Sequence, residues 1–216
     1  MRLNLVFLTV ALAACGTNKP QVSGTTGVAP PPVHRQVVQN PDAGHGSIVP
    51  GEFVGPLRSD STRADLATRL GEGALKDQDV DIGEGQVQAG TVIHAGTDHE
   101  LRAVWQTSER DALAWVHVIG TAWELPGGLS PGATLVQAET ALGTFTFNGF
   151  IGDDSGFVDL EGTRLAGHTA KTTLRMVADS NAASCQSAAL QVQHLSSDAP
   201  AVQACAPSLG DVIVRL

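Results

Sequence analysis

A short helix signature occurs twice in this chain, 72 positions apart, and it restricts the fold more than any other feature. Thr62 and Thr134 are each followed three residues later by a longer polar side chain, and a Leu-Gly pair closes each segment. Thr with an acidic or amide side chain at that spacing forms a capping box in the first turn of a helix. Glycine accepts the left-handed backbone that ends one. We therefore expect helices at 63–70 and 135–142.

Runs with β character follow both helices, which predicts an α+β fold of short helices packed on antiparallel sheet. The expected strands lie at 86–95, 101–106, 112–119, 145–150, 157–160, 172–177 and 211–216, with hairpin turns at 96–98 and 152–156 and a short helix at 199–205. The run 112–119 is apolar on both sides, which is typical of a central strand. A helix plus β-meander unit would then occur in tandem, at 51–122 and at 123–216, the latter with a C-terminal extension. The sequence leaves open whether the two units form one domain or two.

The N-terminus has the pattern of an export signal. Met1 and Arg2 precede an apolar run to Leu12, and Ala13 and Ala14 stand before Cys15. This run is too short for a permanent membrane span, which predicts a signal peptide over 1–14.

The cleavage region resembles the lipobox of bacterial lipoproteins. That resemblance implies that Cys15 carries diacylglycerol and fatty acyl chains such as palmitate, and becomes the new N-terminus. Each buried methylene contributes about 0.8 kcal/mol, so two or three chains anchor a protein firmly. Gly16 follows the cysteine instead of Asp, which by analogy with Gram-negative sorting favours the periplasmic face of the outer membrane.

Residues 15–50 are expected to form a flexible tether. This stretch holds six of the eleven prolines and shows no apolar period. The remaining cysteines, Cys185 and Cys205, form an even pair in a chain bound for an oxidising compartment, so we predict a disulfide, with two buried free thiols as the alternative.

The charge balance argues against one class of partner. The net charge is −9, and no basic patch that would bind phosphates is visible, so nucleic acid is excluded as a partner. The expected partners are the membrane, through the N-terminal lipid, and a protein of the envelope. We predict no cofactor.

One group of side chains could bind a metal ion. His94, Asp98 and His99 surround an expected hairpin tip, but their spacing fits no dedicated zinc motif, so a solvated hairpin is the default interpretation and a metal site is the alternative. Asp77, Asp79, Asp81 and Glu84 lack the glycine and final Glu of a calcium loop, so a solvated acidic edge is expected there.

Four phenylalanines are concentrated in one predicted hairpin. Phe145, Phe147, Phe150 and Phe157 lie within thirteen residues. Core packing is the default interpretation, and an exposed patch that docks a partner is the alternative.

Two further resemblances extend over the folded part. The motif Gly132-Ala133-Thr134, Gln137-Ala138 and Leu142-Gly143 resembles the helix of small outer-membrane lipoproteins of the β-barrel assembly type, and its doubling is similar to the tandem β-lactamase inhibitory protein. A longer likeness is to a family of bacterial lipoproteins of unknown function. It is carried by Ile82 to Gly85, Gly90-Thr91-Val92, Leu101 to Trp105, Asn148-Gly149-Phe150 with Asp153 and Gly156, and Ser197 to Pro200. Neither resemblance implies an activity.

No nucleophile elbow, phosphate loop or catalytic triad is visible in the sequence. The leading hypothesis is therefore a lipid-anchored, non-enzymatic binding protein of the cell envelope. A metal-assisted hydrolase using His94, Asp98 and His99 is one alternative, and a structural envelope lipoprotein is another.

Lipidation at Cys15 can be tested directly. Mass spectrometry of native protein is expected to show a chain that begins at Cys15 and carries acyl groups, because the signal should be cleaved immediately before that residue. Replacing Cys15→Ser should leave the leader uncleaved. An unmodified thiol at this position in native protein would contradict the prediction.

Overall fold

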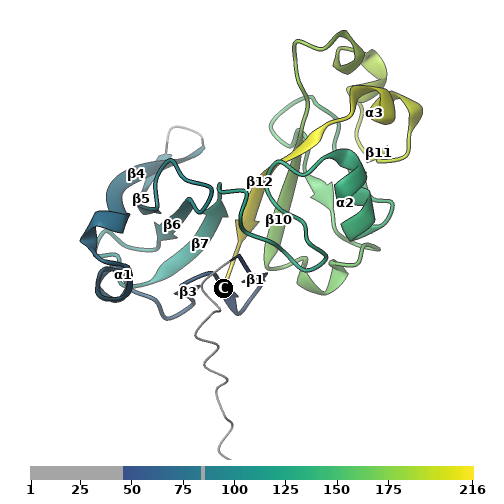
Figure 1. Cartoon of the computed structure of the whole chain (residues 1–216). Helices are drawn as coiled ribbons and strands as arrows, with labels where there is room; N and C mark the ends of the chain where they lie inside the picture. The colour runs from purple at the N-terminus through teal and green to yellow at the C-terminus, as the bar shows by residue number, and fades with distance from the viewer. Residues whose placement is uncertain (1–45, 84–85) are drawn as a thin grey trace, which may run out of the picture. The chain divides into compact units, whose positions relative to one another are not determined.

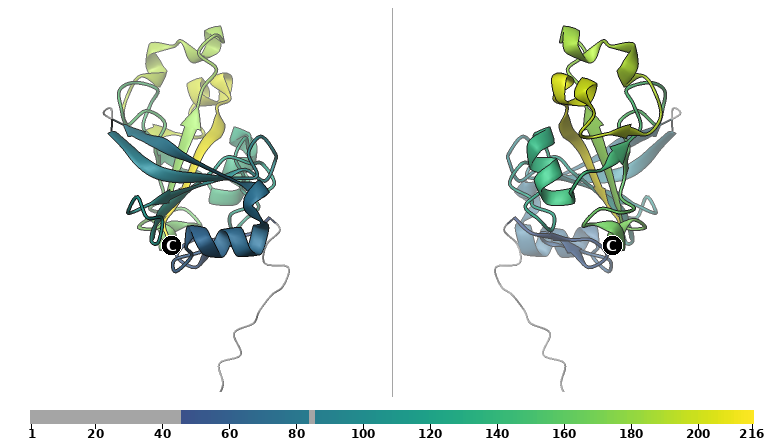
Figure 2. Two further views of the ribbon diagram at one scale, coloured as in Figure 1. Left: turned by 90° about the vertical axis from the view of Figure 1, so that its left-hand side faces the viewer. Right: turned by 90° about the vertical axis from the view of Figure 1, so that its right-hand side faces the viewer.

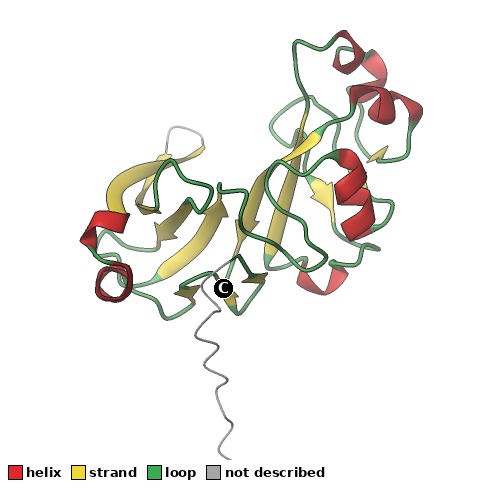
Figure 3. Ribbon diagram, in the orientation of Figure 1, coloured by secondary structure: helices red, strands yellow, loops and turns green. Residues whose placement is uncertain are grey.

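The computed structural model describes residues 46–216 except 84 and 85, and all of them belong to one compact unit. The signal, Cys15 and most of the tether lie outside the described residues. The fold is mixed α+β and consists mostly of strands, as expected (Figures 1 and 3). Ile48 in the first strand is 2% exposed, so the folded part begins slightly ahead of the boundary expected at Gly51. No helix between residues 46 and 216 has the length and apolar character needed to cross a bilayer.

The elements follow each other in two similar series. The first comprises β1 (Ile48–Val49), β2 (Phe53–Val54), β3 (Leu57–Arg58), α1 (Arg63–Leu70), the 3-10 turn η1 (Glu72–Ala74), β4 (Leu75–Gly83), β5 (Gln86–Ile93), β6 (Leu101–Trp105) and β7 (Leu113–Val118). The second comprises α2 (Leu135–Leu142), β8 (Thr146–Phe147), β9 (Val158–Asp159), η2 (Ala166–His168), β10 (Thr172–Val177), η3 (Ala183–Cys185), η4 (Ala188–Leu190), β11 (Leu195–Ser196), α3 (Pro200–Cys205) and β12 (Ser208–Val214).

Both expected capping boxes are confirmed. Thr62 Oγ1 accepts a hydrogen bond from the Asp65 backbone at 3.1 Å, and the Asp65 carboxylate accepts one from the Thr62 backbone at 3.1 Å. Thr134 and Gln137 make the same reciprocal pair. Both helices therefore begin and end at the residues that the sequence predicts.

A six-stranded antiparallel sheet joins the two series. Its strand order is β10-β12-β7-β6-β5-β4, so β7 is central, as predicted. β8 pairs with β9, and a bridge from Phe157 to Arg175 links this pair to β10. The strands β4 to β7 after α1 form a meander, and the strands β8, β9, β10 and β12 after α2 follow a similar order, while β11 pairs with β8. The last strands of the two meanders, β7 and β12, pair with each other (Figure 1).

One face of this sheet lies against the hydrophobic core. Leu66 of α1 and Leu135, Ala138, Ala141 and Leu142 of α2 are buried in the same cluster. The sheet contributes Ile93, Leu101, Ala103, Val116, Val118, Leu174, Val212 and Val214 to that cluster. Because side chains alternate along a strand, the residues between these positions lie on the opposite face.

β4 is a strand where we expected only a solvated acidic edge. Its hairpin with β5 projects from the sheet (Figure 2). Trp105 Nε1 donates to buried Thr91 Oγ1 at 3.0 Å, and this hydroxyl donates to Asp77 Oδ1 at 2.6 Å. Arg63 Nε lies 3.1 Å from Asp77 Oδ2. Asp77 is thus an exposed acid on the edge strand of the sheet, as expected, and it also completes a chain of hydrogen bonds that begins in the core. Glu84 lies outside the described residues.

The C-terminal elements start at different residues from those expected. α3 begins at Pro200, one residue after the expected start, and its N-cap residue, Ala199, provides no side-chain hydrogen bond. Proline is tolerated in the first turn because its missing N–H would have no helical partner there. β12 begins at Ser208, ahead of the expected start at Asp211.

The two caps provide a pair of matched stability tests. Thr134→Ala should destabilise the protein by about 1 kcal/mol, because one backbone N–H of α2 loses its acceptor. Thr62→Ala should act in the same direction on α1. The hydrogen bonds from Thr62 lower the pKa of Asp65 below its usual value of 3.8. The charged form of this cap therefore stabilises the fold at pH values above 3.8, and this stabilisation is lost as the pH falls through the lowered pKa.

Urea unfolding of both variants between pH 7 and pH 3 measures this difference. The effect of Thr62→Ala should shrink at acidic pH, whereas that of Thr134→Ala should stay constant, because Gln137 does not titrate. Equal pH dependence of the two variants would contradict the assignment.

Candidate functional site

The sheet face opposite the core is the strongest candidate for a functional surface. We call it the open face, because its side chains at nine strand or bridge positions are exposed or half-buried. These are Lys76, Arg102, Trp115, His117, Phe157, Thr173, Arg175, Asp211 and Ile213. Two further residues of this face, Val92 and Val104, are buried among them. The surface spans strands from both series and is therefore a product of the whole sheet.

A row of polar and charged side chains crosses the open face. Arg175 lies opposite Asp211 in the register, and His117 lies opposite Arg102. His117 Nε2 is 3.1 Å from Asp211 Oδ1, which links β7 to β12 where the two series meet. Arg175 Nη1 is 3.9 Å from Asp211 Oδ2. The Asp211 carboxylate thus lies between His117 and Arg175.

The carboxylates of this row are held in their charged form. The hydrogen bond with His117 lowers the pKa of Asp211, against the opposing effect of partial burial. Glu100, which precedes β6, accepts a hydrogen bond from the Gly96 backbone at 2.7 Å, and this bond is the main reason that its pKa is lowered. Arg102 donates to the other oxygen of Glu100 at 3.0 Å. The polar groups of the open face are consequently preorganised.

Aromatic rings lie beside these charges. Trp115 is half-buried and stands opposite buried Val104 in the register. The guanidinium of Arg175 lies 5.5 Å from the centre of the Phe157 ring, a cation–π distance. Trp and Arg are the residue types that most often carry binding energy at protein interfaces. The composition of the open face is therefore that of a recognition surface.

The three candidate metal ligands, His94, Asp98 and His99, do not converge on one point. Among the described residues, no group of three or more His, Cys, Asp or Glu side chains is placed to hold a metal ion. His99 Nδ1 instead lies 2.7 Å from Asp98 Oδ1, and the His99 ring packs edge-on against Trp123 at 5.6 Å. His94 occupies the left-handed backbone region at the start of the turn. The hairpin therefore uses these residues for its own structure.

The four phenylalanines divide into two pairs. Phe145 and Phe147 are 2% and 1% exposed, so they belong to the core and offer no docking surface. Phe150 and Phe157 are half-buried. Phe150 packs 5.6 Å from Phe147, and Phe157 belongs to the open face. The docking hypothesis is wrong for the first pair, because their strand positions point toward the helices.

The disulfide is present as predicted. Cys185 and Cys205 are joined by a bond of 2.06 Å, and both residues are buried. The bridge ties η3 to the end of α3 within the connection between β10 and β12.

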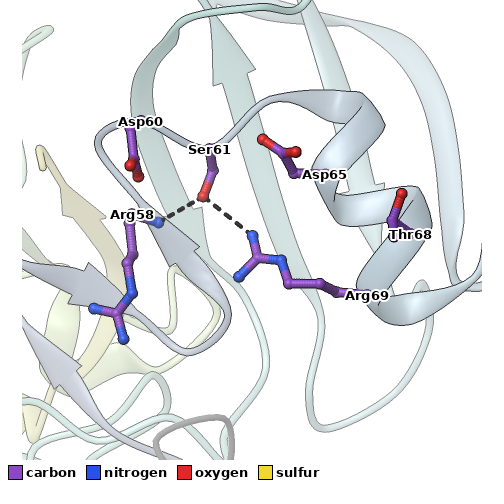
Figure 4. Close-up of a pocket in the computed structure, with 6 residues that line it drawn as sticks. All are labelled: Arg58, Asp60, Ser61, Asp65, Thr68 and Arg69. Atoms are coloured by element: carbon purple, nitrogen blue, oxygen red, sulfur yellow. Dashed lines mark hydrogen bonds between the residues drawn. The ribbon is translucent and has the colours of Figure 1, made fainter. Parts of the chain in front are cut away.

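A hollow lies beside α1, away from the open face (Figure 4). Its volume is about 310 Å³, and Arg58, Asp60, Ser61, Asp65, Thr68 and Arg69 line it. Arg69 already donates to the Pro56 carbonyl at 2.8 Å and to Ser61 Oγ at 3.3 Å, and the Arg58 backbone donates to the same hydroxyl at 2.9 Å. These polar groups hold the loop before α1 against the helix. The hollow is thus explained by local structure.

Sequence reasoning missed the main residues of the open face. His117 and Asp211 are 94 positions apart, and nothing in the local sequence pairs them. The available signal was the alternation in 112–119, which places Trp115 and His117 on one side of a central strand. Their partners become identifiable only once β12 is known to pair with β7.

The sequence matches no known protein-family model and no curated protein. Among solved structures, the chain is similar to the uncharacterized protein yfeY from Escherichia coli. The TM-score is 0.45 at 12% identity, and the alignment covers 79% of this chain and 99% of the other. No sequence family is therefore assigned, and the family resemblances drawn from the sequence stay predictions.

The His117–Asp211 link makes stability depend on pH in a defined way. The pKa of Asp211 is lowered in the folded state. Its charge therefore stabilises the fold at pH values above 3.8, the usual pKa of an aspartate, and this stabilisation is lost as the pH falls through the lowered pKa. Asp211→Asn should therefore reduce stability at pH 7 by at most about 1 kcal/mol, as expected for a partly exposed pair. The deficit should shrink as the pH falls below 3.8.

Thermal unfolding across this pH range measures the effect. Asp153→Asn removes an equal charge from an exposed loop residue and serves as the control. A deficit for Asp211→Asn that is independent of pH would argue against the role of its charge.

Proposed function

We propose that this protein is a lipid-anchored binding protein of the cell envelope, and that a protein partner docks on the open face. The observation that carries the proposal is the half-buried Trp115 on the central strand, which shares the open face with Arg102, His117 and Arg175 from three strands. Such a group combines a large apolar contact with directed hydrogen-bond donors.

The charge distribution supports docking at this face. Lys76, Arg102 and Arg175 stand on this face together with the carboxylates of Asp211, Glu100 and Asp159, whereas the whole chain has 13 Lys and Arg against 22 Asp and Glu. The open face therefore lacks the acidic excess of the rest of the protein. A partner with an acidic or neutral surface can approach it without the repulsion it would meet elsewhere.

The proposed location depends on the N-terminal sequence. The expected lipid at Cys15 would hold the protein at the membrane, and the Pro-rich segment up to Pro50 would let the folded part reach partners at a distance. The disulfide between Cys185 and Cys205 supports an oxidising compartment. We propose the periplasmic face of the outer membrane.

Site-specific photo-crosslinking in the native host tests this function. A photoreactive amino acid at Thr173, which is half-buried on the open face, should yield one discrete adduct with an envelope protein. The same probe at Val136, which is 65% exposed on α2, is the matched control and should yield none.

Adding Trp115→Ala to the Thr173 probe should reduce the adduct at least about tenfold, because central Trp residues at interfaces commonly contribute 2 kcal/mol or more. Circular dichroism would verify that this variant remains folded. Equal adducts at Thr173 and Val136, or an adduct that is insensitive to Trp115→Ala, would refute docking at this face. A deletion strain with a weakened envelope and no adduct would instead favour a structural role.

A further inference from the structure

The two series differ most in one connection. In the first, residues 106–112 join the last two strands of the meander, β6 and β7. In the second, residues 178–207 join the equivalent strands, β10 and β12, and contain two 3-10 turns, a short strand and α3. Long connections within a domain usually serve a function. The buried disulfide between Cys185 and Cys205 fixes this one in place.

A hollow of about 360 Å³ lies where this insertion meets β10. It is lined by Phe150, Ser155, Arg175, Met176, Val177, Ala178, Ser180, Cys185, Gln186 and Gln191. Its volume falls within the range of small-molecule sites. Val177 is 41% exposed, and the neighbouring loop residues Ile151 and Val192 are 56% and 48% exposed. Half of the six large exposed apolar side chains of the described residues therefore surround this region.

Arg175 gives the hollow its chemical character. It is the one charged residue among those that line it, although acids outnumber bases across the protein. Its Nε donates to the Ser155 carbonyl at 2.6 Å, and its Nη1 is 3.9 Å from Asp211, beyond normal hydrogen-bond length. The Nη2 group has no hydrogen-bond partner among the described residues. The side chain is thus fixed through Nε while donors remain for a ligand.

We propose that this hollow binds a small monocarboxylate that carries an apolar group. The carboxylate accepts hydrogen bonds from the Arg175 guanidinium, and the exposed amide of Gln191 supplies a further donor at the rim. The apolar group lies against Val177 and Phe150. The C-terminal residue of a peptide and a fatty acid share this chemistry. Arg175 also belongs to the open face, whereas the other residues that line the hollow are not among those that define that face.

Amide chemical shifts of the full-length, disulfide-bonded chain test the proposal with two probes. N-acetyl-L-leucine represents a peptide C-terminus, and octanoate represents a fatty acid. The methyl ester of each acid is the uncharged control. At least one acid should produce saturable shifts confined to residues around Phe150, Val177 and Gln191, and its ester should bind at least about tenfold more weakly, because a charge-assisted hydrogen bond is lost. The acid that binds more tightly shows whether the ligand is a peptide C-terminus or a fatty acid.

Three variants test the role of Arg175. Arg175→Gln should weaken binding of the acid at least about tenfold and leave that of its ester unchanged. Gln191→Glu alters only an exposed rim residue and should keep the fold. It should weaken binding of the acid, because the new carboxylate repels the carboxylate of the ligand. Arg164→Gln, which removes an exposed guanidinium bound to the Thr140 carbonyl, should have no effect.

The proposal is overturned if neither acid binds, if acid and ester bind equally, or if the shifts are spread over the molecule. It is also overturned if the variants at Arg175 and Gln191 leave the affinity for the acid unchanged. These outcomes are distinguishable from failure of the docking proposal, because that test measures an adduct that depends on Trp115.

Discussion

The pairing of β7 with β12 is the interaction on which the rest of the structure depends. It joins the last strands of two meanders into one six-stranded sheet, through the pairs Val212–Val118, Ile213–His117 and Val214–Val116. The valines of these pairs are completely buried, so separating the two series would expose apolar surface from both. Two units that share this seam and one hydrophobic cluster behave as one compact body, which answers the question that the sequence left open.

The same seam creates two chemically different faces. Alternation along the strands places the valines beneath the helices, while His117, Asp211 and Ile213 are directed to the opposite side. A shift of one residue in the pairing would exchange these sets and bury the ionic groups. The register therefore determines at once where the core lies and which side chains a partner can reach. His117 and Asp211 contribute little to stability as a partly exposed pair, and their position at the seam matters more for the surface they present.

Features that depend on neighbouring residues could be predicted, and features that depend on distant pairing could not. The bounds of α1 and α2 follow from a Thr, a side chain three residues on and a Leu-Gly pair, all within one segment. β4 was missed because alternating aspartates suggest a solvated segment, and the reason that Asp77 is tolerated is an arginine from α1 and a buried threonine from β5. The open face needs the register between β7 and β12, which no local pattern contains. The alternative of a metal site at His94, Asp98 and His99 rested on closeness in sequence alone, and the fold does not bring these three side chains together as ligands.

The differences between the two series indicate where function resides. Both series build similar helix caps and similar strand arrangements, and this shared scaffold does not by itself determine what the protein binds. The second series adds a long insertion whose ordering costs conformational entropy. The disulfide offsets part of this cost, by about 3 kcal/mol for a loop of this length in the chain-entropy model. The insertion also packs on the core, because Leu190, Leu195 and Val202 are buried in the same hydrophobic cluster and β11 pairs with β8. The same segment borders the hollow in which Arg175 is the one charged lining residue, so it both completes the core and forms part of the proposed ligand site.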